Sequence, residues 1–310
     1  MKQPRLSTFF GAVVAAALLF APSAKAQSQA AAGNVTFTVT AVGKKDADVS
    51  NIPKDDVQLF QGKDRKQIGD WRKGDSLFLA ILIDDSIDTT AGGQWEYLRD
   101  FIMAQPPATS IMVGYITDNG TRVLQDFTPD HALAAKALRL PIGFGSIGSS
   151  PYLGTLDLLK RWPKTGPRRS VVLISSGIDY FRGPGFGPFY PDLDPLIARA
   201  ERQNTNIWTI YYPSAGHRGR SFFRTNNAQN NLDKLSQDTG AESYFLGGQT
   251  PVSIKPYLDE IGMHLNNQYL LTFAGNGGAK GKYQSVKVKT EQKEVEFFTP
   301  AAVFIPPAAQ

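Results

Sequence analysis

The chain has 310 residues, of which 42% are hydrophobic and 20% charged, and it contains no cysteine. This composition is typical of a folded globular protein of one or two domains. The lack of cysteine excludes disulfide bonds, thiolate metal ligands and cysteine nucleophiles. The formal charge of +5 is not concentrated in a basic run, so we expect no nucleic-acid partner.

Residues 1–26 predict an export signal. Lys2 and Arg5 precede an uncharged apolar stretch over residues 9–21, and Ala24-Lys25-Ala26 supplies a small-residue cleavage site. The apolar stretch is shorter than the ~20 residues that a spanning helix needs, and no later segment approaches that length. We therefore expect a chain that begins near Gln27, is periplasmic or extracellular, and has no transmembrane segment.

Residues 27–73 predict a short β segment. Residues 34–40 alternate β-branched or aromatic side chains with polar ones, as a half-buried strand does, and residues 57–60 form a second strand. A turn at residues 61–64 leads to a return strand around residues 66–68. This is too little for an independent domain, because isolated hairpins are marginal in water.

Residues 74–265 predict an α/β domain in which strands alternate with helices. The strands are expected at residues 77–83, 111–116, 171–174, 207–211 and 242–245. The helices are expected at residues 94–104, 131–138, 151–162, 193–202, 230–237 and 254–265. This alternation predicts a doubly wound, mostly parallel sheet. The turn Asp118-Asn119-Gly120 adds an antiparallel strand at residues 122–124.

Residues 266–310 return to β structure, with strands expected at residues 268–273, 283–289 and 294–298. Neither end of the chain has enough apolar area to form a domain alone. We therefore expect the N- and C-terminal strands to pair into a small β-sandwich beside the α/β domain.

A polar loop follows the first strand of the α/β domain and reads Asp84-Asp85-Ser86-Ile87-Asp88-Thr89-Thr90. Ligands of open α/β sheets collect outside the carboxyl ends of the strands. Its alternating oxygen-bearing side chains suit Mg²⁺, which takes about six oxygen ligands. The alternative interpretation is a solvated loop whose side chains cap a helix.

Several segments resemble von Willebrand factor type A domains and the bacterial proteins described as VWFA-related. Residues 81–86 (Ile-Leu-Ile-Asp-Asp-Ser) resemble the segment that opens the D-x-S-x-S loop of that family, and residues 171–177 (Val-Val-Leu-Ile-Ser-Ser-Gly) resemble its V-V-L-L-T-D-G strand. Residues 51–60 resemble the L-T-x-x-D-F entry, residues 235–240 resemble L-A-x-x-T-G-G, and residues 267–271 resemble x-Q-Y-L-L. These matches occur in the order of the family, and together they span nearly all of the chain after the signal.

The resemblance implies a metal-ion-dependent adhesion site with altered ligands. Asp84 and Ser86 match the first loop, whereas Asp88 stands at its second serine. Ser150 stands at the threonine of the second loop, and Ser176 stands at the aspartate of the third loop. The expected cofactor is therefore Mg²⁺ or Ca²⁺ in a changed or weakened site, with a degenerate site as the alternative; Asp179 could contribute a carboxylate.

The loop over residues 180–194 carries the aromatic side chains Phe181, Phe186, Phe189 and Tyr190 on a Gly- and Pro-rich frame. Exposed aromatic rings supply much of the affinity in protein interfaces, so these residues are candidates for binding a protein partner. Arg218 and Arg220 follow the next strand and could extend the face towards acidic partners. The alternative is that the loop packs over its own domain.

The remaining motifs give weaker indications of function. Residues 143–148 fit G-x-G-x-x-G, but they follow a helical pattern and the position about twenty residues on is the basic Arg168, which disfavours dinucleotide binding. His131, His217 and His264 are widely separated, and there is no G-x-S-x-G elbow. We expect a non-enzymatic protein-interaction module. The alternatives are a metal-assisted hydrolase that uses the same loops and a purely structural envelope protein.

Overall fold

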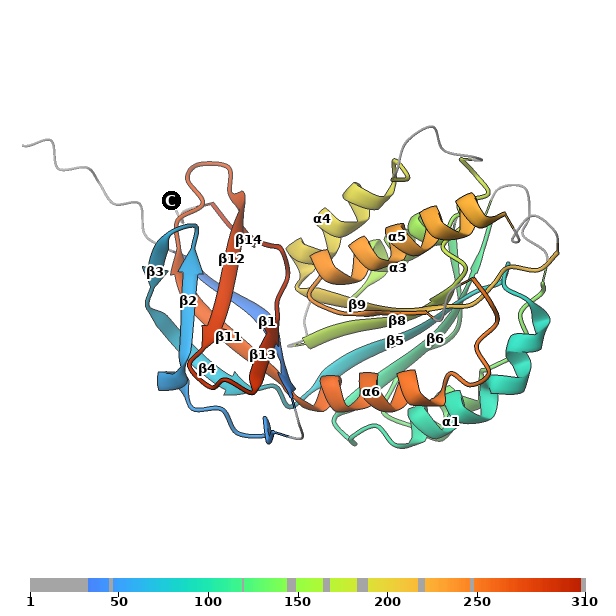
Figure 1. The fold of residues 1–310 in the computed structure, drawn as a ribbon, viewed down its shortest axis with the longest axis horizontal. Coiled ribbons are helices and arrows are strands. Elements are labelled where there is room, and N and C mark those ends of the chain that lie inside the picture. The colour runs from blue at the N-terminus through green and yellow to red at the C-terminus, as the bar shows by residue number, and fades with distance from the viewer. Residues whose placement is uncertain are drawn as a thin grey trace, which may run out of the picture.

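The computed structural model describes residues 33–44, 47–118, 120–143, 149–163, 168–182, 189–216, 221–245 and 248–307. These residues form a helix-flanked sheet and, beside it, a pair of antiparallel sheets (Figure 1). The predicted export signal lies outside the described residues, as do Asn119 and residues 144–148 of the glycine motif. No helix in the described ranges is long and apolar enough to cross a membrane.

The central sheet has six strands in the order β10-β9-β8-β5-β6-β7. Its strands are β5 (Leu77–Asp84), β6 (Thr109–Thr117), β7 (Gly120–Thr128), β8 (Arg168–Ser175), β9 (Thr205–Tyr211) and β10 (Ser243–Tyr244). All neighbouring pairs are parallel except β6 and β7, whose antiparallel pairing runs up to Thr117 opposite Gly120. The expected doubly wound, mostly parallel sheet is confirmed.

Helices cover both faces of this sheet (Figure 1). They are α1 (Trp95–Met103), α2 (His131–Lys136), α3 (Pro151–Arg161), α4 (Leu193–Gln203), α5 (Phe222–Asp238) and α6 (Lys255–Asn266), with the 3-10 turn η2 (Thr89–Gln94) before α1. Leu79 and Ile81 of β5 join the core under α1, α2 and α6. Ala80 and Leu82 join the core under α3, α4 and α5, because successive side chains of a strand point to opposite faces.

The two ends of the chain pair into a β-sandwich, as the sequence predicts. Its sheets have the orders β13-β1-β11-β4 and β14-β12-β2-β3. The strands are β1 (Gly33–Gly43), β2 (Val57–Gln61), β3 (Asp64–Lys66), β4 (Ile68–Lys73), β11 (Gln268–Gly275), β12 (Lys282–Thr290), β13 (Val295–Phe298) and β14 (Ala302–Ile305), with the turn η1 (Lys54–Asp56) before β2. Phe37, Leu59 and Leu271 lie in one core shared by both sheets.

Three elements differ from the sequence prediction. The expected return strand over residues 66–68 is two strands, because the chain leaves β3 and enters β4 of the opposite sheet at Gln67. Ile68 is buried in the shared core, and this burial explains the change of sheet. Helix α5 begins at Phe222 rather than residue 230, and β14 was not predicted.

Arg168, the first residue of β8, joins the α/β domain to the sandwich. Its side chain is buried, and its guanidinium donates hydrogen bonds to the carbonyl oxygens of Ser76 (3.2 Å), Asp75 (3.3 Å) and Leu265 (2.7 Å). A further bond reaches Oε1 of Gln268 at 3.1 Å. Burial lowers the pKa of Arg168 to about 10. The residue therefore ties the start of β5 to the α6–β11 junction.

Candidate functional site

The strands β5 and β8 are neighbours at the switch point of the central sheet. Helix α1 follows β5 by way of η2 and covers one face, whereas α4 follows β8 and covers the other. The loops leaving these two strands therefore diverge, and such a point leaves a crevice at the carboxyl edge of the sheet. Asp84 ends β5 and Ser175 ends β8, so their side chains meet at this edge.

Asp84 is fully buried at the switch point. The hydroxyl of Ser175 donates a 2.7 Å hydrogen bond to its Oδ2, and the backbone N–H of Ser86 donates a 2.9 Å bond to its Oδ1. Burial raises the pKa of Asp84, since the charged form loses its hydration. Among the described residues no lysine or arginine forms an ion pair with this carboxylate.

The Ser86 side chain is also buried. Its hydroxyl lies close enough to Asp84 to lower the pKa of that carboxyl, yet it makes no well-oriented hydrogen bond within the described part of the chain. A buried hydroxyl without a partner is costly, so it marks a position where a ligand would be favourable.

Asp85 has the opposite environment although it is the next residue. The Arg139 guanidinium donates to both of its carboxylate oxygens, at 2.7 and 2.5 Å. Arg139 also lies 3.9 Å from the centre of the Tyr115 ring, and its backbone N–H donates to the hydroxyl of Tyr115. Asp85 is thus a structural ion pair and offers little to a metal.

Ser150 and Asp179 form a second hydrogen-bonded pair of oxygen-bearing side chains. Ser150 caps the N-terminus of α3, where its Oγ accepts a 3.3 Å bond from the backbone N–H of Leu153 and donates a 2.8 Å bond to Oδ2 of Asp179. Burial raises the pKa of Asp179. Burial raises the pKa of Tyr152, and the charges of Asp179 and Asp84 raise it further. Asp179 therefore supplies a carboxylate that Ser176 lacks.

The remaining two predicted ligands have other roles. Oδ1 of Asp88 accepts bonds from the backbone N–H and the hydroxyl of Thr90, both at 2.9 Å, which caps the turn η2. The Ser176 hydroxyl accepts a 3.3 Å bond from the backbone N–H of Ile178. Asp88 and Ser176 therefore make local hydrogen bonds, whereas Asp84, Ser86, Ser150 and Asp179 are buried oxygen-bearing side chains at this edge.

These residues fit a hard divalent cation. Their donors are all oxygens. Among the described residues the two carboxylates form no ion pair, and the Ser86 hydroxyl makes no hydrogen bond. Mg²⁺ and Ca²⁺ bind such oxygens and complete their shells with water. A bound cation would favour the ionised form of both carboxyl groups and so offset the burial that raises their pKa values.

The aromatic loop after β8 divides into exposed and buried parts. Phe181 and Phe189 are each nearly half exposed. Tyr190 is buried and packs against Tyr152 with the ring centres 5.5 Å apart, so it belongs to the core rather than to a partner surface. Phe186, Arg218 and Arg220 lie outside the described residues.

Two further aromatic residues lie at the same edge of the sheet, and the sequence interpretation missed them. Phe222 and Phe223 begin α5, which follows β9, and they are 76% and 83% exposed. The hydroxyls of Tyr180 and Ser214 are hydrogen bonded at 2.5 Å, which ties the loop after β8 to the loop after β9. The adjacent phenylalanines in the sequence were the available signal, but they fell before the helix predicted from residue 230.

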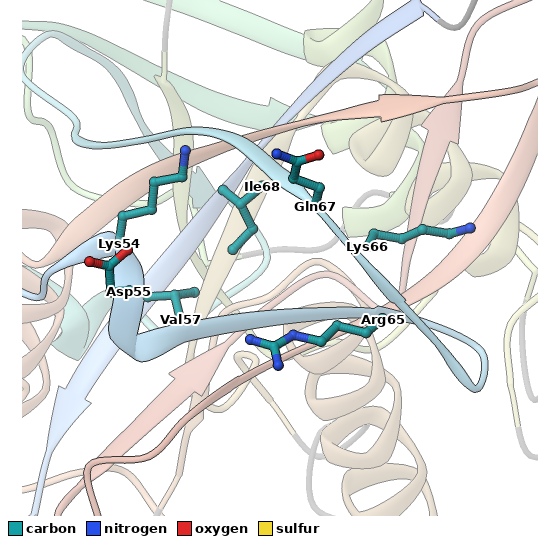
Figure 2. Close-up of a pocket in the computed structure, with 7 residues that line it drawn as sticks. All are labelled: Lys54, Asp55, Val57, Arg65, Lys66, Gln67 and Ile68. Atoms are coloured by element: carbon teal, nitrogen blue, oxygen red, sulfur yellow. The ribbon is translucent and has the colours of Figure 1, made fainter.

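A hollow of about 470 Å³ lies in the sandwich, away from this edge (Figure 2). Lys54, Arg65 and Lys66 surround it, and Val57 and Ile68 form its apolar side. Nζ of Lys54 donates to the carbonyl of Gly69. The hollow shares no residue with the Asp84 site.

No protein-family model matches the sequence, and no curated protein matches it. Solved structures with a similar fold do exist. Von Willebrand factor type A domains are among them. A von Willebrand factor type A protein from Catenulispora acidiphila shares 9% identity, with 92% of this chain and 76% of that chain covered and a TM-score of 0.45.

Two more solved structures are similar to this chain. The ArnB paralog VWA2 from Sulfolobus acidocaldarius shares 10% identity over 90% of this chain and 76% of its own, with a TM-score of 0.38. An aerotolerance-related membrane protein from Bacteroides fragilis shares 11% identity over 62% of this chain and 99% of its own, with a TM-score of 0.44. These similarities describe the fold and carry no information on function.

Proposed function

We propose that this chain is an exported, non-enzymatic binding protein that captures a partner protein through a divalent cation held at the Asp84 site. The single observation that carries the proposal is the buried Asp84 carboxylate, which has no cationic partner among the described residues. An ionised carboxylate is costly to bury unless a charge compensates it. A cation held by Asp84, Ser86, Ser150 and Asp179 would supply that charge.

The cation supplies a positive centre that a partner carboxylate can complete, as the resemblance to type A domains implies. The chain's own residues hold and orient it. Ser150 is fixed as the cap of α3, and Ser175 holds Oδ2 of Asp84. The exposed rings of Phe181, Phe222 and Phe223 would contribute apolar contact around this centre, because aromatic side chains dominate many interfaces.

Export rests on the leader pattern of residues 1–26. The proposed ligands are all oxygens, so the cation site needs no thiolate, and the chain contains no cysteine. A periplasmic or extracellular location is therefore part of the proposal.

The test is calorimetric titration of the mature chain with Mg²⁺, Ca²⁺ and Mn²⁺. We expect one ion to bind per chain, and we expect Asp84→Asn and Asp179→Asn to lose that binding. Asp88→Asn is the matched control, because Asp88 caps η2 and should leave the affinity within about threefold. A peptide with a single glutamate should then bind in the presence of Mg²⁺ and dissociate when EDTA is added.

Two outcomes would oppose the proposal. Absence of heat with all three ions, or equal heat in Asp84→Asn, would leave the structural role as the better explanation. Cation-dependent hydrolysis of p-nitrophenyl acetate or p-nitrophenyl phosphate that Asp84→Asn abolishes would favour the hydrolase instead.

A further inference from the structure

A second group of metal-binding side chains lies at the opposite part of the α/β domain, next to the sandwich. Glu242, Glu260 and His264 each offer one ligand atom, and these atoms all lie within 4.8 Å of one another. Glu260 and His264 are four residues apart on α6, so they share one face of the helix. Glu242 directly precedes the edge strand β10, and its carbonyl accepts a bond from the N–H of Thr209 in β9.

The His264 ring is held in place by its neighbours. It is buried, its centre lies 5.2 Å from that of Trp208, and the Phe298 ring meets it edge-on at 5.6 Å. The Tyr244 hydroxyl lies 3.4 Å from both Nδ1 of His264 and Oε2 of Glu242. Burial lowers the pKa of His264 to about 4.

The charges around Glu242 also favour a cation. Burial and the neighbouring acids Glu260, Asp233 and Glu296 raise the pKa of Glu242. Within the described ranges neither Glu242 nor Glu260 forms an ion pair. Glu296 is paired with Lys44 at 2.7 Å, so that lysine is already engaged. Among the described residues, Glu242 and Glu260 therefore lie beside a buried histidine without an ion-pair partner of their own.

A pocket gives access to this group from solvent. It has a volume of about 360 Å³ and lies between the end of α5, the start of β10 and the end of β13. Glu242 and Phe298 both line it, so the wall of the pocket carries one of the ligands and the ring that packs on another. The pocket therefore leaves the Glu242 side of this group open to water.

We propose that Glu242, Glu260 and His264 form a second metal site, selective for Zn²⁺ and independent of the Asp84 site. One imidazole nitrogen with two carboxylates is a ligand set that suits Zn²⁺, whereas the all-oxygen Asp84 site suits Mg²⁺ or Ca²⁺. Ligands of one Zn²⁺ lie about 3 to 4 Å apart, since each bond is about 2.0–2.2 Å long. The half-buried glutamates can close the remaining distance by small side-chain rotations.

The ion would add a direct link between α6 and the edge of the central sheet, beside the hydrogen bond between Tyr244 and His264. Glu260 and His264 belong to α6, Glu242 belongs to the edge of the central sheet, and His264 contacts Phe298 of β13 in the sandwich. Zinc at this point would therefore fix α6 against the sheet edge beside the junction of the two domains.

The test uses the full mature chain, stripped with EDTA and titrated with ZnCl₂ in a calorimeter. The variants Glu242→Gln and Glu260→Gln keep size and hydrogen-bonding capacity at half-buried positions. Glu96→Gln, an exposed carboxylate on α1, is the matched control, and Asp84→Asn removes the first site. Far-UV circular dichroism and melting of the metal-free proteins confirm that each variant is folded.

We expect one Zn²⁺ per chain in the wild type, in Glu96→Gln and in Asp84→Asn. Binding should weaken more than tenfold in each glutamine variant, since even outer partners of metal ligands change affinity by about 10–100-fold. Zinc should raise the melting temperature of the wild type but not of Glu260→Gln. X-ray absorption at the zinc edge should lose its imidazole signal in His264→Gln; if that variant does not fold, the two glutamate variants decide.

Equal Zn²⁺ affinity in the wild type and both glutamine variants would overturn the proposal, as would no Zn²⁺ binding at all. Loss of Zn²⁺ binding in Asp84→Asn with full binding in Glu260→Gln would place the ion at the first site and refute a second one. Because the two sites are tested with different ions and variants, failure here leaves the proposed function of the Asp84 site intact.

Discussion

Asp84 and Asp85 are adjacent in sequence, yet only Asp85 is neutralised by a basic side chain, the guanidinium of Arg139. The two side chains leave the end of β5 towards opposite faces of the sheet. Asp85 meets Arg139 on one face, whereas Asp84 meets the Ser175 hydroxyl on the other. This difference separates a structural carboxylate from one that is available to a ligand, and it underlies the first two predictions.

We expect the presence of a cation to decide whether the wild type or the Asp84→Asn variant is the more stable protein. The raised pKa of Asp84 means that its ionisation opposes folding above its unfolded pKa of about 3.9. Without cations at pH 7, we expect the variant to be the more stable protein, because it buries no charge at this position. At a Mg²⁺ concentration 100 times the Kd, the wild type should gain about 2.7 kcal/mol and become the more stable protein. Urea unfolding with and without Mg²⁺ measures both values, and an unchanged order would count against a cation at Asp84.

Arg139→Met should destabilise the chain with little effect on cation binding. The substitution keeps an apolar stem over Tyr115 but leaves the buried Asp85 carboxylate without its bidentate partner. We expect a loss of about 2–3 kcal/mol in the free energy of unfolding, somewhat less than for a fully buried pair because Arg139 is partly exposed. Urea unfolding checks the value beside Arg65→Met, an exposed control expected to change stability by less than about 0.5 kcal/mol.

Arg168→Lys should weaken the link between the two domains. A lysine keeps the charge but cannot donate to four separate acceptors from one planar group. We expect a loss of about 2–4 kcal/mol, since several buried acceptors lose their donor together. Arg72→Lys on the exposed side of β4 is the control. Equal melting temperatures for the two variants would show that Arg168 does not hold the junction.

Glu201→Gln should remove a pH dependence of stability. Burial on α4 raises the pKa of Glu201 to about 7, and its Oε1 accepts a 3.0 Å bond from the N–H of Ala302 in β14. A carboxyl group with a raised folded pKa favours folding while protonated, so wild-type stability should fall as the pH rises from about 4.5 to above 7. The variant should lose that part of the decline. Urea unfolding at pH 5, 6, 7 and 8 gives the two curves, and parallel curves would contradict the shift.

Much of the fold could be predicted from the sequence because burial leaves a clear pattern. β5, β6, β8 and β9 are apolar on both faces, and the helices between them show helical spacing. The start of α5 was missed because its first turns are polar apart from Phe222 and Phe223, which point to solvent. The change of sheet at Gln67 depends on which core receives Ile68, and local sequence does not contain that information.

The loops of the candidate site could be predicted from the sequence, but its full set of ligand residues could not. Asp84, Ser86 and Ser150 lie where the alternation of strands and helices places them. The role of Asp179 depends on how the chain turns after Ser176, which brings its carboxylate to Ser150. The cluster of Glu242, Glu260 and His264 was not predicted, because no two histidines have a metal-binding spacing. The signal in the sequence was the four-residue spacing of Glu260 and His264 on α6.

The closure of the sandwich by both ends of the chain sets an order of folding. Thr36 and Thr272 share a 2.8 Å hydrogen bond across 236 residues, and β2 pairs with β12 over a similar separation. At a synthesis rate of roughly 5–20 residues per second, β1 and β2 are made on the order of 10 to 50 s before their partner strands. During that time β1 and β2 have unpaired edges that could pair with other chains. The central sheet can assemble earlier, so the sandwich closes last and the early strands stay open to pairing with other chains until then.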